Sequence, residues 1–191
     1  MRPILLLALA TLSCSSADDA TAQAGNAIAV ARPEMRAAAA LTVTSPDFAA
    51  GGAIPLVHSA YGEGVSPALR WSGLPAGTRS LALMMEDPDA TSARPFVHWL
   101  AWNIDPAAGA LPRGAVPAGT VQGRNSRGSA LYFGPRPHGS RPHHYHFQLF
   151  ALDAPLALPA GASREQLLAA MRGHVLARGD LVGLFAEPRG R

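Results

Sequence analysis

Residues 80–104 read SLALMMEDPDATSARPFVHWLAWNI, and this stretch contains the two clearest strand patterns in the chain. Its two halves, SLALMMEDPD (80–89) and FVHWLAWNI (96–104), are short and largely apolar. Runs of this length between turn-forming residues are typical of buried β-strands. The stretch therefore predicts a β protein in which these two strands are neighbours.

Further strands are predicted on both sides of this stretch. LTVTSPDF (41–48) opens as a short β-branched strand, and PALRWSGLP (67–75) is typical of a strand that ends in a turn. HYHFQLFAL (144–152) has the same character, and LVGLFA (181–186) is the expected last strand. The 17 prolines and 19 glycines also favour a loop-rich β protein.

One helix is predicted near the C-terminal end, over about 164–178. Residues 163–166, Ser-Arg-Glu-Gln, have the form of a capping box, and Gly179 is a natural stop. Apolar residues follow the box at helical spacing: Leu167, Leu168, Met171, Val175 and Leu176. Many strands and one late helix predict a mostly β fold, an antiparallel β-sandwich with a helix packed near its end.

The composition is that of one globular domain. The chain has 191 residues, of which 48% are hydrophobic and 15% are charged, so it is long enough for one core and too apolar to be disordered. All 16 basic residues are arginine. The net charge of +3 is too small to indicate nucleic-acid binding by itself.

The first residues, MRPILLLALATLSC (1–14), have the form of an export signal. Arg2 is a short basic region, and the apolar run 4–12 is too short to span a bilayer. The only cysteine, Cys14, follows this run, so the folded domain cannot contain an internal disulfide. Either Cys14 ends a lipoprotein signal and carries a lipid, or ordinary cleavage follows a small residue such as Ala17.

Both alternatives place the protein outside the cytoplasm, either in the periplasm or anchored to a bacterial membrane by a lipid on Cys14. We assign 1–24 to the export signal. Residues 25–40, rich in alanine and without a strand pattern, are predicted to be a flexible linker. The folded domain is expected to occupy 41–191.

Polar residues continue the apolar rows of the two central strands, because side chains alternate across a strand. The row of Leu83 and Met85 continues into Asp87 and Asp89. These carboxylates either cap backbone amides in an Asp-Pro-Asp turn or stand at the mouth of an apolar pocket. His98 is expected on the row of Phe96, Leu100, Trp102 and Ile104, where it needs a polar partner; Asp87 is a candidate.

Three of the seven histidines open the strand over 143–152. His143 and Tyr145 lead its apolar row, whereas His144 and His146 point to the other face. This alternation argues against one metal ion bound by all three histidines. His144 and His146 are either two metal ligands at i and i+2 or, as we favour, part of a solvated sheet face.

A local concentration of arginines precedes this strand. Between 106 and 152 there are five arginines and no acidic residue, which gives +5 − 0 = +5 against +3 for the whole chain. Four of them lie within 124–141. They form either a solvated loop or a cationic rim that draws anions toward a pocket.

Five segments in this order resemble the phosphatidylethanolamine-binding protein family, in its bacterial Raf-kinase-inhibitor-like branch. The resemblance spans nearly all of 41–186. The segments are DPDA (87–90), VHWLAWNI (97–104), GRNSRG (123–128), YFGPRP (132–137) and HHYHFQLFALD (143–153).

This resemblance implies a Greek-key β-sandwich with a small preformed pocket for phosphate or a phosphorylated head group. It implies no cofactor, no metal and no catalytic residue, and it implies a homodimer. The ligand-binding residues would be Asp87, His98, Gly134, Pro135, His143 and Tyr145, with Asp89, Trp99, Asn125 and Pro137 in support. The chain departs from the family pattern at His144, where Arg is usual, at His138, where many members have Pro, and at Arg127, where an aromatic is common.

The sequence thus predicts an exported binding protein with a small anion pocket, either a binding module or an inhibitor of a protein partner. The alternative is a metal-binding protein or hydrolase that uses Asp87, His98 and His143. No HExxH, no GxSxG and no cysteine nucleophile is present to nominate a reaction, so we expect the protein not to be an enzyme.

Overall fold

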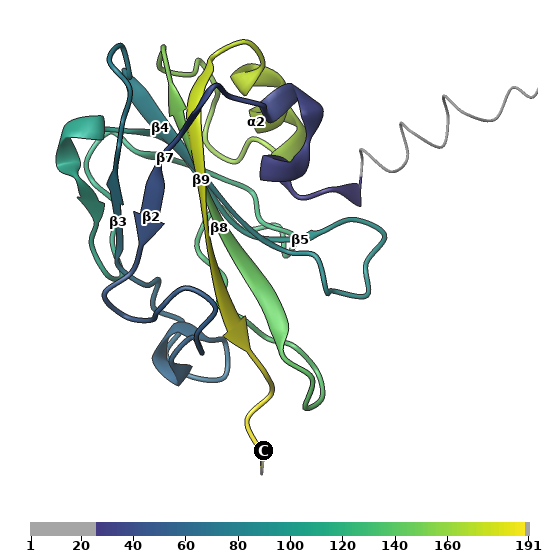
Figure 1. Cartoon of the computed structure of the whole chain (residues 1–191). Coiled ribbons are helices and arrows are strands. Elements are labelled where there is room, and N and C mark those ends of the chain that lie inside the picture. The colour runs from purple at the N-terminus through teal and green to yellow at the C-terminus, as the bar shows by residue number, and fades with distance from the viewer. Residues whose placement is uncertain (1–25, 190–191) are drawn as a thin grey trace, which may run out of the picture.

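Two β-sheets pack face to face in the computed structural model, which describes residues 26–189 (Figure 1). The larger sheet has six strands in the order β1 (Ala39–Ala40), β9 (Val175–Phe185), β8 (His143–Leu152), β4 (Ser80–Asp87), β5 (Phe96–Ile104) and β7 (Val121–Gly123). The smaller sheet has the order β2 (Thr42–Thr44), β3 (Leu69–Ser72) and β6 (Ala110–Leu111). All pairs are antiparallel except β1 with β9. The predicted mostly β sandwich is confirmed.

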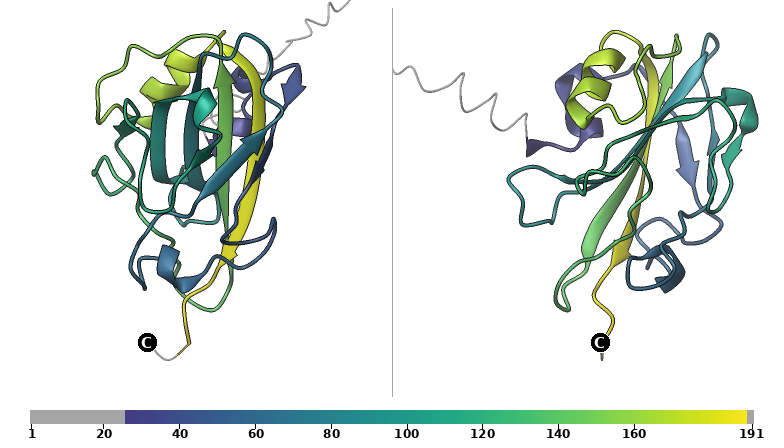
Figure 2. Two further views of the ribbon diagram at one scale, coloured as in Figure 1. Left: turned by 90° about the vertical axis from the view of Figure 1, so that its left-hand side faces the viewer. Right: turned by 180° about the vertical axis from the view of Figure 1, so that it is seen from behind.

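Helix α2 (Arg164–Met171) covers the face of the large sheet that lies opposite the small sheet (Figure 2). Four 3-10 turns complete the described elements: η1 (Ala29–Ala31), η2 (Pro33–Met35), η3 (Leu56–His58) and η4 (Pro106–Ala108). None of the helices within residues 26–189 is long and apolar enough to cross a membrane.

The large sheet is buried on both faces. Between the two sheets lie aromatic and aliphatic side chains that include Trp71, Trp99 and Phe147. On the other face, Trp102 and Phe150 pack with Leu167, Leu168 and Met171 of α2. Strand β4 is buried along its whole length, because neither of its faces meets solvent. Burial on both faces explains why this segment is an almost continuous apolar run rather than an alternating one.

The helix is shorter than the predicted 164–178. The capping box is present, since the Ser163 hydroxyl accepts from Gln166 N and the Gln166 side chain accepts from Ser163 N. The helix ends at Met171, and Gly173 takes a left-handed conformation with φ of 78°. Val175 and Leu176 fit the helical spacing but belong to β9, where Val175 pairs with Leu152 of β8. The last strand is therefore longer than the predicted 181–186.

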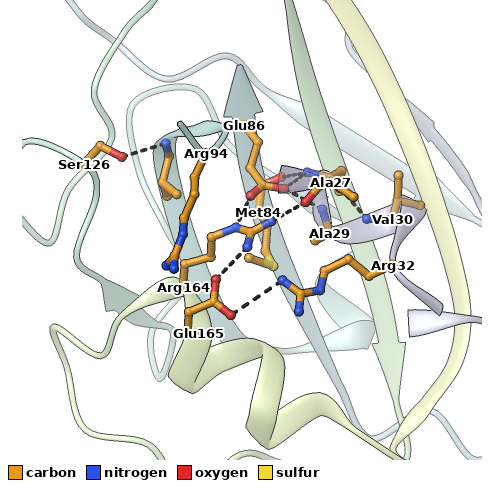
Figure 3. A network of polar contacts seen from close by, with 12 residues as sticks. Ala27, Ala29, Val30, Arg32, Met84, Glu86, Arg94, Ser126, Arg164 and Glu165 are labelled. Carbon is orange, nitrogen blue, oxygen red and sulfur yellow. Dashed lines mark hydrogen bonds and ion pairs between the residues drawn. The ribbon is translucent and has the colours of Figure 1, made fainter. Parts of the chain in front are cut away.

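Residues 26–40 pack against the domain instead of forming the flexible linker that we predicted. The side chains of Ala29 and Met35 are fully buried, and β1 extends the edge of the large sheet beside β9. Ala29 N donates to Glu86 Oε2 at 2.7 Å (Figure 3). Val30 N donates to Gln148 Oε1 at 2.5 Å. The prediction failed because the segment is held by partners far along the chain. The predicted export signal and Cys14 lie outside the described residues.

A buried ion pair fixes this segment and α2 to the same carboxylate. Glu86 is fully buried, and Arg164 Nε donates to its Oε1 at 2.5 Å (Figure 3). Gln148 Nε2 donates to Glu86 Oε2 at 2.7 Å, and Arg164 Nη2 donates to the Ala27 carbonyl at 2.7 Å. Hydrogen-bond donors from three separate parts of the chain therefore stabilise the buried carboxylate of Glu86.

Two irregularities in the pairing of β4 with β5 change which side chains share a face. Met85 pairs with Trp99 whereas Glu86 pairs with Val97, so His98 is an extra residue in β5. A second shift lies near Asn103, which has a positive φ of 56°. A bulge interrupts strict alternation. His98 therefore faces the inner side of the sheet together with Trp99, not the row of Leu100 and Trp102 on which we expected it.

Candidate functional site

A pocket of about 450 Å³ opens where β4 ends and where β5 and β8 begin. Because β4 lies between β5 and β8 and runs antiparallel to both, these three strand ends meet at one edge of the sheet. Its walls consist of Asp87, Ala90, Thr91, Phe96, His98, Arg127, Phe133, Arg136, Pro137, His138, His143 and Tyr145. Topology thus brings together four of the six residues that the resemblance implied for ligand binding.

An aspartate and a histidine form the polar floor of this pocket. Asp87 has 3% of its surface exposed, and its Oδ2 accepts from His143 Nδ1 at 2.8 Å. Its Oδ1 accepts from Asp89 N at 2.8 Å, so the Asp-Pro-Asp sequence also forms the expected turn. A carboxylate can only accept, so the Nδ1 of His143 carries the proton. The second nitrogen of His143, Nε2, is left for other partners.

His98 is bound to the backbone rather than to Asp87, the partner that we had considered for it. Its Nδ1 donates to the Phe133 carbonyl at 2.7 Å. The ring stacks on Phe133 with a 5.6 Å centroid distance and contacts Tyr145 edge-on at 5.1 Å. Burial lowers the pKa of His98 to about 4. The Phe133 carbonyl and the charge of Asp87 raise this pKa, but their effect is smaller than that of burial. At neutral pH, Nε2 of this ring is therefore a hydrogen-bond acceptor.

The Tyr145 hydroxyl is a buried donor that makes no well-formed hydrogen bond among the described residues, although the Asp87 carboxylate lies near it. The side chain is fully buried, and its oxygen makes no hydrogen bond within residues 26–189. Burial, together with the nearby carboxylate of Asp87, raises the pKa of Tyr145, so the hydroxyl keeps its proton. Buried polar groups are nearly always hydrogen-bonded, and an unpaired one in a pocket indicates a position for a ligand or water.

Two of the four arginines within 124–141, Arg127 and Arg136, reach the mouth of the pocket. The Arg127 guanidinium lies over the ring of Phe133 at 5.0 Å, and that of Arg136 lies over Tyr61 at 5.9 Å. His138 also lines the pocket. Arg113 lies elsewhere, where it pairs with Asp47.

His144 and His146 each bond to a different carboxylate on the outer side of β8. His144 Nδ1 bonds to Asp89 Oδ2 at 2.7 Å, and His146 Nδ1 bonds to Asp180 Oδ2 at 2.7 Å. Burial alone would raise the pKa of Asp89, but hydrogen bonds from His144 hold that pKa below its ordinary value. Between residues 26 and 189, no three His, Cys, Asp or Glu side chains gather as metal ligands would.

Gly134 and Pro135 do not line the pocket, although the resemblance implied that they would. A Cβ on Gly134 would lie 2.5 Å from the His58 carbonyl oxygen and 2.7 Å from Ala60 N. The Pro135 carbonyl accepts from Ala60 N at 3.0 Å. The pair therefore serves close packing of one loop on another, and Pro137 is the wall residue of this run.

Three of the four supporting residues, Asp89, Trp99 and Asn125, also lie outside the pocket lining. Trp99 borders a second hollow of about 410 Å³, where its Nε1 donates to Gln122 Oε1 at 2.8 Å. Asn125 fastens the loop that carries Arg127: its Oδ1 accepts from Arg127 N at 2.9 Å, and its Nδ2 donates to the Leu131 carbonyl at 2.8 Å. Asn125 is buried, with 3% exposed.

Sequence reasoning missed the aromatic part of the site. Phe96 contacts His98 at a centroid distance of 4.8 Å, and Phe133 stacks on its ring. Ala90 and Thr91, from the loop after β4, complete the wall. The only available signal was that Phe96 opens the strand segment 96–104 and that Phe133 lies within YFGPRP (132–137), and aromatic residues in such segments are too common to identify a site.

A two-sheet sandwich with a pocket of aspartate, histidine and tyrosine at the strand ends is the arrangement that the resemblance implied. Residues 44–186 match the family described as phosphatidylethanolamine-binding protein. The chain therefore belongs to the phosphatidylethanolamine-binding protein family. A UPF0098 protein from Methanothermobacter thermautotrophicus is 45% identical over 139 residues, which cover 70% of this chain and 91% of that protein.

A second relative is similar over more of this chain. A Mycobacterium tuberculosis protein named as a candidate lipoprotein, LppC, is 43% identical over 150 residues, which cover 78% of this chain and 74% of that protein.

Solved structures agree with this assignment. A homologue from Chlamydia trachomatis, CT736, superposes with a TM-score of 0.74 at 37% identity and covers 78% of this chain and 99% of its own. Escherichia coli YbcL, described as a new member of the mammalian family, superposes with a TM-score of 0.72 at 31% identity and covers 78% of this chain and 100% of its own.

Proposed function

We propose that the protein is an exported binding protein whose pocket holds a small oxyanion of the phosphate type. The observation that carries this proposal is the buried Tyr145 hydroxyl, which lines the pocket and has no partner among the residues described. A donor that is kept protonated and unpaired beside His143 and two arginines suits an anionic oxygen.

The roles of the two pocket histidines differ. His143 donates its Nδ1 proton to Asp87, so its Nε2 is the nitrogen left to donate to an anion when it carries a proton. His98 differs from His143, because its neutral ring offers an acceptor at Nε2. It suits the hydroxyl of a monoprotonated phosphate or the ammonium of a head group.

Hydrogen bonds to a charged partner contribute about 1.5–3 kcal/mol each. Donation from Tyr145 and His143 therefore supplies roughly 3–6 kcal/mol, which is enough for millimolar binding of a small anion before the arginines are counted.

Calorimetric titration of the full-length protein with inorganic phosphate tests the proposal. Tyr145→Phe should weaken binding about tenfold. The same variant should keep the free energy of unfolding within about 0.5 kcal/mol, since the lost hydroxyl makes no bond in the protein. His144→Gln, a histidine outside the pocket, is the control and should bind as the parent does. Phosphate binding that survives both Tyr145→Phe and His143→Gln would contradict the proposal.

The form of residues 1–14 and the name of the mycobacterial relative support export, with a lipid on Cys14 as the proposed anchor. Mass spectrometry of the mature N-terminus decides between the two routes. A lipid-modified Cys14 supports the anchor, and a free N-terminus after Ala17 supports ordinary cleavage.

A further inference from the structure

The pocket mouth carries two guanidinium groups without a carboxylate partner. Arg127 and Arg136 both line the pocket and both are exposed, and within residues 26–189 neither forms an ion pair. Four other described arginines have carboxylate partners: Arg32 pairs with Glu34, Arg113 with Asp47, Arg164 with Glu86 and Arg172 with Glu34. Guanidinium groups that line a pocket without a carboxylate partner are available to an anionic ligand.

The position of Arg127 is fixed by the loop that carries it. The Asn125 side chain closes residues 125–131 into a tight loop. Its Oδ1 accepts from Arg127 N and Ser129 N, and its Nδ2 donates to the Leu131 carbonyl. Ser126 ties the same loop to β5, since Ser126 N donates to the Val97 carbonyl and Val97 N donates to Ser126 Oγ. The Arg127 guanidinium lies over the Phe133 ring, so less side-chain conformational entropy is lost when it binds a ligand.

The charges that line the pocket do not balance. Arg127 and Arg136 contribute +2, and Asp87, the only carboxylate in the lining, contributes −1, which gives +2 − 1 = +1 with neutral histidines. The oxygens of Asp87 are already engaged by His143 and by Asp89 N. An incoming ammonium group therefore finds a carboxylate whose two oxygens already accept hydrogen bonds, whereas a phosphate dianion finds net positive charge.

We propose that Arg127 and Arg136 make this pocket selective for a dianionic phosphomonoester over a zwitterionic phosphodiester head group. This inference rests on the proposed anion-binding function and adds the class of ligand to it. The volume of about 450 Å³ exceeds what a lone phosphate fills, and Phe96 and Phe133 form an apolar wall. The favoured ligand is thus a phosphomonoester with a small apolar or aromatic group.

Two esters distinguish the classes: phenyl phosphate, a monoester that is mostly dianionic at pH 7.5, and glycerophosphoethanolamine, a zwitterionic diester. Full-length parent protein should bind phenyl phosphate at least about tenfold more tightly. Arg127→Ala and Arg136→Ala should each weaken phenyl phosphate about tenfold and change the diester by less than about threefold. Arg124→Ala, an exposed arginine of the same region outside the lining, is the matched control and should change neither.

The outcomes separate the two proposals. Equal affinity of the parent for both esters, or equal losses for both in the arginine variants, overturns the selectivity and leaves anion binding intact. A preference for the diester also overturns it. Binding of neither phenyl phosphate, glycerophosphoethanolamine nor inorganic phosphate by the parent overturns the proposed function itself.

Discussion

Acid should destabilise this protein through the buried ring of His98. The pKa of His98 falls from its ordinary value of 6.5 to about 4 because the ring is buried. The unfolded chain then takes up a proton at a higher pH than the folded one does. The stability that depends on the neutral ring is complete above pH 6.5 and is lost as the pH falls toward 4.

The size of the effect follows from the two pKa values. With 6.5 for the unfolded chain and about 4 for the folded one, the free energy of unfolding falls by about 2 kcal/mol between pH 7 and pH 5. The full shift corresponds to about 3 kcal/mol at still lower pH. Other groups also titrate over this range, so a variant without this ring is required to isolate the contribution.

His98→Asn is that variant, because its side-chain amide can still donate to the Phe133 carbonyl while it cannot be protonated. Urea unfolding of both proteins at pH 7 and pH 5 gives four free energies. The parent should lose about 2 kcal/mol more than His98→Asn between the two pH values, even though the variant is less stable at pH 7 through lost ring contacts. Equal losses in the two proteins would refute the reasoning.

Two further predictions concern the scaffold. Arg164→Met should destabilise the protein by about 3–5 kcal/mol, because it leaves the buried charge of Glu86 unpaired, and adding Glu86→Gln should recover most of that loss. Urea unfolding of both variants checks this, and a stable single variant would refute it. Gly134→Ala should cost about 2 kcal/mol or more, since its Cβ would lie 2.5 Å from the His58 carbonyl oxygen. An unchanged melting temperature would contradict that expectation.

The local signals in the sequence located the strands well. Strand β5 has the predicted bounds 96–104, because its apolar run begins after Pro95 and stops at Asp105-Pro106. The capping box at Ser163 correctly placed the start of α2. In each case the deciding interaction lies within a few residues of the signal.

The predictions from sequence failed where contacts between distant parts of the chain determine the local structure. Val175 suits a helix or a strand by spacing, and its pairing with Leu152 settles the choice. Residues 26–40 contain no strand pattern, but their backbone amides reach Glu86 and Gln148 more than fifty residues away. An alanine-rich segment contains no sequence pattern from which such hydrogen-bond partners could be predicted.

In the candidate site, too, local sequence patterns were informative, whereas contacts between distant residues were not predictable. Alternation and the resemblance together singled out Asp87, His98, His143 and Tyr145, and all four line one pocket. The sequence did not reveal that His98 bonds to the Phe133 carbonyl, because a backbone acceptor has no residue-type signal. It also could not show the bulge at His98, which depends on pairing with β4.

The most direct test of the central claim is a nitrogen-15 NMR measurement on the imidazole rings of the full-length protein, with and without inorganic phosphate at pH 7. We predict that Nε2 of His143 becomes protonated when phosphate binds, because the anion and Asp87 together stabilise the charged ring. We also predict that His98 stays neutral with its proton on Nδ1. Rings of His143 and His98 that do not respond to saturating phosphate would contradict the claim that this pocket binds an oxyanion.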